Sequence, residues 1–111
     1  NEEDDSPNEK TLGRDVLSAF KRAKFKLTKA DMVDRKIDSE VPKNEIHDLF
    51  LYTKSGKDED GDTEVVRILI RYDRGTGKIL KTNMETFVNK KLIGDKFLTG
   101  KNDLLRAIKR M

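Results

Sequence analysis

Lysine and arginine side chains near the C-terminus are the residues of this sequence best suited to bind a ligand. Residues 89–111 hold seven cations and two carboxylates, so this segment has a net charge of +5. Cations at this density can contact phosphate groups and release counterions, which makes binding depend on salt. Three further cations on expected strands could extend the surface. The ten candidate nucleic-acid contacts are Lys90, Lys91, Lys96, Lys101, Arg106, Lys109, Arg110, Arg67, Arg71 and Lys81.

The three strand cations are Arg67, Arg71 and Lys81, and whether they meet depends on the register of the sheet. If Ile70 pairs with Leu80, all three side chains lie on the outward face, because side chains alternate between the two faces of a strand. The alternative for all ten cations is an ordinary solvated surface without a ligand.

Aromatic side chains that could stack on nucleic-acid bases are few. Only Tyr52 and Tyr72 are expected to be exposed, because a core this small needs the five phenylalanines. The aromatic motif of RNA-recognition domains is absent from the sequence. We therefore expect contact with the backbone of a nucleic acid rather than reading of its bases.

Two loops resemble ion-binding motifs but lack residues that these motifs require. The acidic run that begins at Asp58 alternates like a calcium loop, but the twelfth position, which needs a carboxylate, holds Leu69. A solvated hairpin tip is predicted instead, and weak, non-specific cation binding is the alternative. The glycine-rich run before Lys78 lacks the first glycine of a phosphate loop, because Tyr72 is there, and Ile79 replaces the required Ser or Thr. A turn explains these glycines.

Residues for catalysis or for a transition-metal site are missing. His47 is the only histidine and there is no cysteine, so the usual zinc ligand sets are unavailable. None of Ser6, Ser18, Ser39 and Ser55 lies in the pattern of a nucleophile elbow. We therefore predict that the protein is not an enzyme and uses no metal or cofactor. An enzyme would need a polar pocket assembled from residues that are distant in sequence.

A first helix is predicted over residues 11–23. Its apolar side chains recur at intervals of 4, 4 and 3, which is the stripe of a helix packed on a core. Lysine and arginine gather in its last turn, where cations suit the negative end of the helix dipole. The stripe consists of Leu12, Val16, Phe20 and Ala23, widened by Leu17.

Strands are predicted for most of the middle of the chain. Residues 25–27 alternate with lysines, and residues 28–37 fit a strand or irregular structure. The aromatic-rich run at 46–54 favours a strand. Residues 64–72 give the strongest alternation, and residues 78–82 are expected to return as their hairpin partner.

Two helical segments are predicted to follow. Asn83 could cap a helix over residues 84–91 that Gly94 interrupts, and Asn102 could cap a last helix over residues 103–110. The expected fold is therefore α+β, with an N-terminal helix, an antiparallel meander of three or four strands, and one or two C-terminal helices.

The composition indicates one small, heavily charged domain. Of the 111 residues, 34% are hydrophobic and 41% are charged. Residues 1–9 carry five carboxylates and no cation, so with a net charge of +3 for the whole chain the remainder carries +8. We expect residues 1–10 to form a disordered acidic leader and residues 11–111 to form a single α+β domain. The leader is either a solvated end or an arm that screens a basic surface.

A small binding domain without catalytic activity is the expected function. The favoured partner is a nucleic acid, held by its phosphate backbone on the basic C-terminal surface. The alternative is an interaction module (an inhibitor, adaptor or effector) that binds an acidic protein through a sheet edge, such as residues 64–72 or 25–27, or through its basic face. No run approaches the roughly 20 apolar residues of a membrane span. The lack of cysteine fits a reducing, intracellular compartment, and a start at Asn1 is compatible with a removed leader.

Overall fold

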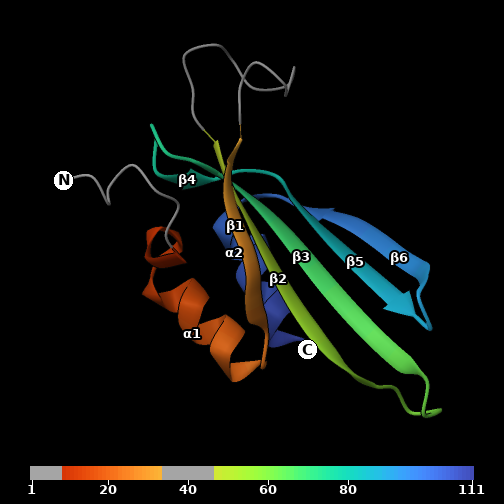
Figure 1. The fold of residues 1–111 in the computed structure, drawn as a ribbon. Helices are drawn as coiled ribbons and strands as arrows, with labels where there is room; N and C mark the ends of the chain where they lie inside the picture. Colours follow the sequence, from red (N-terminus) through yellow and green to blue (C-terminus); the bar gives the residue numbers. More distant parts are fainter. Residues whose placement is uncertain (1–8, 34–46) are drawn as a thin grey trace.

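The computed structural model describes residues 9–33 and 47–111. The first eight residues of the expected leader, and residues 34–37 of the segment expected to be strand or irregular structure, lie outside the described residues. The described chain forms one antiparallel sheet with two α-helices on one of its faces (Figure 1). The predicted α+β class is confirmed, and the sheet has six strands rather than three or four.

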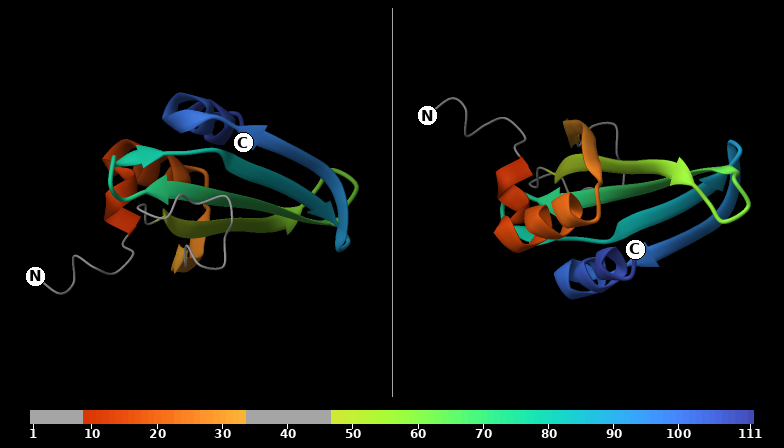
Figure 2. Two further views of the ribbon diagram at one scale, coloured as in Figure 1. Left: turned by 90° about the horizontal axis from the view of Figure 1, so that it is seen from above. Right: turned by 90° about the horizontal axis from the view of Figure 1, so that it is seen from below.

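The strand order is β1-β2-β3-β5-β6, with the short β4 paired to the end of β3. Every paired neighbour is antiparallel. The turns that join β2 to β3 and β5 to β6 lie at the far end of the sheet, beyond the helices (Figure 2). The strands are β1 (Lys26–Val33), β2 (His47–Lys57), β3 (Thr63–Asp73), β4 (Lys78–Ile79), β5 (Thr82–Val88) and β6 (Lys91–Leu98).

Both terminal helices lie where the apolar periodicity predicts them. A 3-10 helix, η2 (Glu9–Leu12), precedes α1 (Arg14–Arg22), and α2 (Gly100–Lys109) follows the last strand. Neither described helix has the length and apolar character needed to cross a membrane. Their buried side chains are Val16, Ala19 and Phe20 in α1, and Leu104, Ala107 and Ile108 in α2.

The two helices run side by side in the same direction (Figure 1). Near their N-termini, Lys101 Nζ lies 2.8 Å from the Asp15 carboxylate. Near their C-termini, Ala23 of the α1 cap and Met111, just after α2, line the same shallow hollow. The C-terminal ends of both helices therefore lie together at one end of the helical layer.

A Schellman motif ends α1 with a lysine in the position that usually holds glycine. Lys24 has a φ of 67°, and its N–H donates to the carbonyl of Lys21, while the N–H of Phe25 donates to the carbonyl of Phe20. The rings of Phe20 and Phe25 meet edge to face at 5.4 Å, which supplies the hydrophobic contact of this motif. The motif turns the chain from α1 directly into β1.

The core lies between the helices and one face of the sheet. Even-numbered residues in the central parts of β2 and β3 point toward the helices, and Phe50, Ile68 and Ile70 are fully buried. Tyr52 is also buried, and its ring stacks on Phe20 with centroids 3.9 Å apart. The expectation that Tyr52 is an exposed platform for bases is therefore wrong, whereas Tyr72 is half-buried.

The helix predicted over residues 84–91 is wrong, because this segment forms β5 and enters β6. Asn83 and Phe87 belong to an unbroken register in which β5 pairs with β3, and β6 pairs on its other side. Because β5 is hydrogen-bonded to a strand on each side, this pairing decides its structure in spite of the local helical pattern of its sequence. The predicted break at Gly94 lies inside β6, and the chain reverses at Asn89 and Lys90, whose φ values of 50° and 71° are typical of a two-residue hairpin turn.

The predicted register of the second hairpin is also wrong. Tyr72 pairs with Ile79, and the N–H of Leu80 donates to the carbonyl of Arg71, so Ile70 does not pair with Leu80. β4 holds only two residues, because the neighbour of β3 along most of its length is β5. The strand at 64–72, proposed as a possible edge, is therefore central, whereas residues 26 and 27 of the other proposed edge belong to β1, which is an edge strand.

Candidate functional site

The ten predicted cations do not form one surface. Lys90 and Lys91 lie at the turn between β5 and β6, at the far end of the sheet from the helices (Figure 2). Lys96 lies within β6 opposite Met84. The remaining C-terminal cations are spread along α2, from Lys101 and Arg106 to Lys109 and Arg110 at its end.

Carboxylates in the described part of the chain pair with at least three of the ten cations. Lys101 contacts Asp15 at 2.8 Å, Arg106 contacts Asp103 at 2.6 Å, and Arg67 lies 3.7 Å from Glu85. The hydrogen bond from Lys101 lowers the pKa of Asp15. The Thr99 backbone N–H, followed by Arg106, lowers the pKa of Asp103. A nearby carboxylate repels an incoming phosphate, so these cations are poor candidates for polyanion contact.

The three strand cations do share the sheet face that points away from the helices, which we call the outer face. Arg67 and Arg71 alternate with the buried residues of β3. Lys81 Nζ lies 4.1 Å from the ring centre of Phe97, which pairs with Asn83 on that face. They thus share a face as expected, although the register that led to this expectation is wrong. Glu85 and Asp95 lie opposite each other on the same face, so its charge is mixed.

A denser group of cations surrounds the C-terminal ends of the two helices, and we call it the basic end. Residues 16–28 and 104–111 contain no carboxylate at all. Apart from Arg106, which pairs with Asp103, these segments contribute six exposed cations, and within the described part of the chain none of the six forms an ion pair. They are Lys21, Arg22, Lys24, Lys26, Lys109 and Arg110.

The basic end brings together cations that are about 85 residues apart in the sequence. Arg22 and Lys109 line one hollow between the helix ends, and Lys21, Lys24 and Lys26 line a second hollow between α1 and β1. Cations at a helix C-terminus also stabilise the helix, because they lie near the negative end of its dipole. Only Lys109 and Arg110 of the basic end were expected as ligand contacts. The four others are missed when the last turn of α1 is considered only as a helix end, although a run without carboxylates from 16 to 28 is visible in the sequence.

The hollow between α1 and β1 has an apolar lining and a rim of lysines. Its volume is about 550 Å³. It is lined by Leu17, Phe20, Phe25, Leu27 and Tyr52 together with Lys21, Lys24 and Lys26.

Comparison with known proteins gives no relative. No protein-family model, curated protein or solved structure matches this chain.

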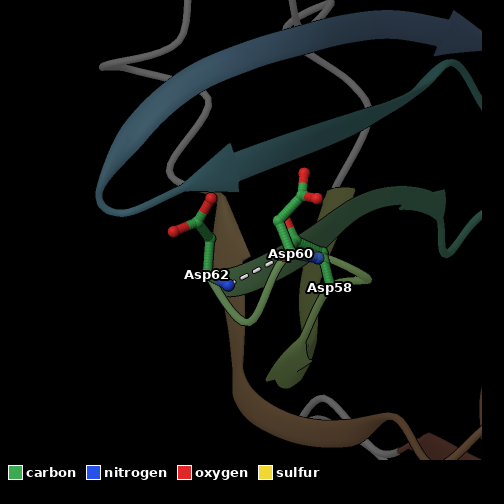
Figure 3. A group of neighbouring side chains, drawn as sticks. All are labelled: Asp58, Asp60 and Asp62. Carbon is green, nitrogen blue, oxygen red and sulfur yellow. Dashed lines mark hydrogen bonds between the residues drawn. The ribbon is translucent and has the colours of Figure 1, made fainter.

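The acidic run forms the turn between β2 and β3, as predicted for a hairpin tip (Figure 3). Ligand atoms of Asp58, Asp60 and Asp62 all lie within 4.8 Å of one another. Asp58 Oδ1 accepts hydrogen bonds from the N–H groups of Asp60 and Asp62 at 3.0 and 2.8 Å. These bonds hold the loop closed and give Asp58 a role in the turn itself.

A second polar group lies at the opposite end of β2 and β3. Arg74 donates two hydrogen bonds to the buried Asp48 carboxylate, at 2.9 and 3.3 Å. Asp73 Oδ1 accepts the N–H groups of Gly75 and Thr76. Burial opposes ionisation of Asp73, but hydrogen bonds from the Thr76 side chain and from these two amides outweigh it and lower its pKa. The amides of the glycine-rich turn thus bind Asp73, which explains this turn without a phosphate ligand.

Proposed function

We propose that the protein binds the phosphate backbone of a nucleic acid through its basic end. The observation that supports this proposal is the group of six exposed cations without a carboxylate between them. A surface of this kind attracts polyanions by releasing counterions and needs no particular base sequence. The site differs from the predicted one, because it combines the end of α2 with the end of α1.

The salt dependence of binding tests this function. If all six cations contact phosphates on duplex DNA, the slope of log Kobs against log salt is about −5. The measurement is fluorescence anisotropy of a labelled duplex of random sequence, titrated between about 50 and 200 mM salt. Absence of binding at the lowest salt, or affinity that does not change with salt, would contradict the proposal.

Two matched variants locate the contact surface. Arg22→Gln with Lys109→Gln removes two charges from the basic end, and Lys90→Gln with Lys91→Gln removes two charges from the far hairpin turn. The first variant is expected to reduce the salt slope by about 2, and the second to leave it unchanged. Equal effects of both variants would mean that net charge, rather than the basic end, controls binding.

A protein partner bound at the sheet edge is a second candidate function. β6 is an edge strand, and it carries three of the exposed large apolar side chains: Leu92, Ile93 and Phe97, which are 48%, 60% and 57% exposed. An extended segment of another protein could pair with such an edge and cover these side chains. A stoichiometric protein complex that survives nuclease treatment, and that Ile93→Asp abolishes while Arg22→Gln does not, would favour this function over the first.

A further inference from the structure

The hollow between α1 and β1 combines two properties that a phosphate backbone would not use together. Its walls are apolar, formed by Leu17 and Leu27 above an aromatic floor, and its volume of about 550 Å³ is within the range of small-molecule sites. Three exposed lysines also belong to its lining and form its rim. A ligand that fits both properties has an apolar body and an anionic head.

The charge around this hollow has a single sign. Lys21, Lys24 and Lys26 line it, and Lys54 Nζ lies 6.0 Å from the ring centre of Phe25. No carboxylate belongs to the described lining. An anionic head at the rim would meet attraction from up to four cations and repulsion from no acidic group of that lining.

Lys24 provides a second, independent observation. It adopts a left-handed backbone conformation, with a φ of 67°, at the helix-end position where glycine carries no steric cost. Backbone strain of this kind is concentrated at functional sites. A lysine therefore occupies this position against the local preference of the backbone, and it lines the hollow.

The aromatic floor argues for an alkyl chain rather than a nucleic-acid base. Phe20, Tyr52 and Phe25 are only 1%, 2% and 6% exposed, and the rings of Phe20 and Tyr52 stack on each other. A base needs an exposed ring face on which to stack. A flexible alkyl chain needs only an apolar surface that it can lie along, and Leu17 and Leu27 add to the apolar surface of this hollow.

We infer that this hollow binds an anionic amphiphile, such as a medium-chain fatty acid. The carboxylate lies against Lys21, Lys24 and Lys26, and the alkyl chain lies along the apolar lining. The site shares three lysines with the basic end, but it requires neither nucleic-acid binding nor the cations of α2. An occupied hollow would reduce polyanion affinity, and by linkage a bound polyanion would reduce amphiphile affinity to the same degree.

Isothermal titration with dodecanoate, kept below its micelle concentration, tests the inference. Saturable binding with one molecule per chain is expected. Acetate, which lacks the chain, should not bind, and dodecyltrimethylammonium, which has the opposite charge, should bind at least about tenfold more weakly. Equal binding of both dodecyl compounds would show that charge plays no part and would overturn the inference.

Lys24→Gly is the decisive variant, because glycine suits the backbone at this position and the fold is retained. Its matched control is Lys90→Gly, which removes the same charge from another left-handed lysine, at the far hairpin turn. Lys24→Gly should weaken dodecanoate binding by about tenfold, while Lys90→Gly should leave it unchanged. Equal affinities for the two variants would contradict the site.

Leu17→Glu tests the apolar wall, with Leu92→Glu on the exposed β6 as its control. Only Leu17→Glu should abolish dodecanoate binding, with circular dichroism reporting that both variants are folded. If an acidic peptide with a single leucine binds and dodecanoate does not, the hollow is a protein-docking site and the inference fails. Anisotropy with duplex DNA is measured separately. Absence of dodecanoate binding would therefore not contradict the proposed nucleic-acid function, and absence of DNA binding would not contradict the amphiphile site.

Discussion

At the scale of single residues, left-handed lysines mark two places where the sequence departs from the preference of the backbone. Lys24 ends α1, and Lys90 lies in the turn between β5 and β6. A side chain in this conformation brings its Cβ close to the backbone, which costs about 1–2 kcal/mol. Two lysines of a charged sequence therefore occupy positions that glycine would fill with less strain.

Replacement of Lys24 by glycine should stabilise the protein. Relief of the left-handed strain exceeds the additional chain entropy that glycine loses on folding, so the free energy of unfolding should rise by about 0.5–1 kcal/mol. Urea unfolding followed by circular dichroism measures this change, with Lys26→Gly in β1 as the contrasting variant. Lys26→Gly should be destabilising, since glycine weakens a strand. A loss of stability in Lys24→Gly would show that contacts of the lysine side chain outweigh the strain.

Asp73 makes stability depend on pH in the acid range. Its pKa is lowered from the ordinary value of 3.8 in the folded state, so the folded form holds the ionised carboxylate more favourably than the unfolded form does. Its contribution is therefore fully present above about pH 5 and is lost as the pH falls through 3.8 and below. Asp73→Asn should flatten the fall in Tm between about pH 5 and 2. An unchanged slope would mean that Asp15 and Asp103, whose pKa values are also lowered, dominate the acid transition.

At the scale of elements, the sequence correctly predicts those helices and strands whose structure depends on the apolar pattern of a single segment. The helix over 11–23 and the strand over 64–72 have periodicities set by burial on one side, and the structure confirms both. The β5–β6 hairpin could not be predicted, because neighbouring Phe87 and Val88 resemble a helical face. In the sheet they point to opposite faces, and only pairing with Val65 and Glu64 shows this. The basic end was missed for a related reason, since its cations come from the ends of two helices and the start of β1, and the parallel packing of the helices has no signature in either segment.

The β5–β6 turn itself can be tested as an element. Asn89 and Lys90 form a two-residue connection with positive φ at both positions, a conformation in which Asn-Gly is the preferred pair. Lys90→Gly should therefore raise the free energy of unfolding by about 0.5–1 kcal/mol. It should leave polyanion binding unchanged, because this turn lies far from the basic end (Figure 2). Thermal unfolding and anisotropy on the same variant separate these two effects, and weaker binding would place the contact surface at the hairpin instead.

At the scale of the whole molecule, positive and negative charge gather in separate parts of an elongated fold. The net charge is only +3, yet carboxylates concentrate in the turn at Asp58, Asp60 and Asp62 while the cations of the basic end have none beside them. A polyanion approaching the molecule is therefore attracted to the basic end and repelled from the acidic turn. Net charge alone understates this attraction, because it averages over both regions.

This division of charge predicts that a polyanion stabilises the folded protein. A ligand that binds only the folded form adds about 2.7 kcal/mol at 100 times its dissociation constant, which corresponds to a rise in Tm of about 10 °C for a domain of this size. Thermal unfolding with a short DNA duplex measures the shift. The variant Arg22→Gln with Lys109→Gln should lose most of it, and Lys90→Gln with Lys91→Gln should keep it. An equal shift in both variants, or none in the unaltered protein, would show that the six cations of the basic end do not act as a single site in the folded state.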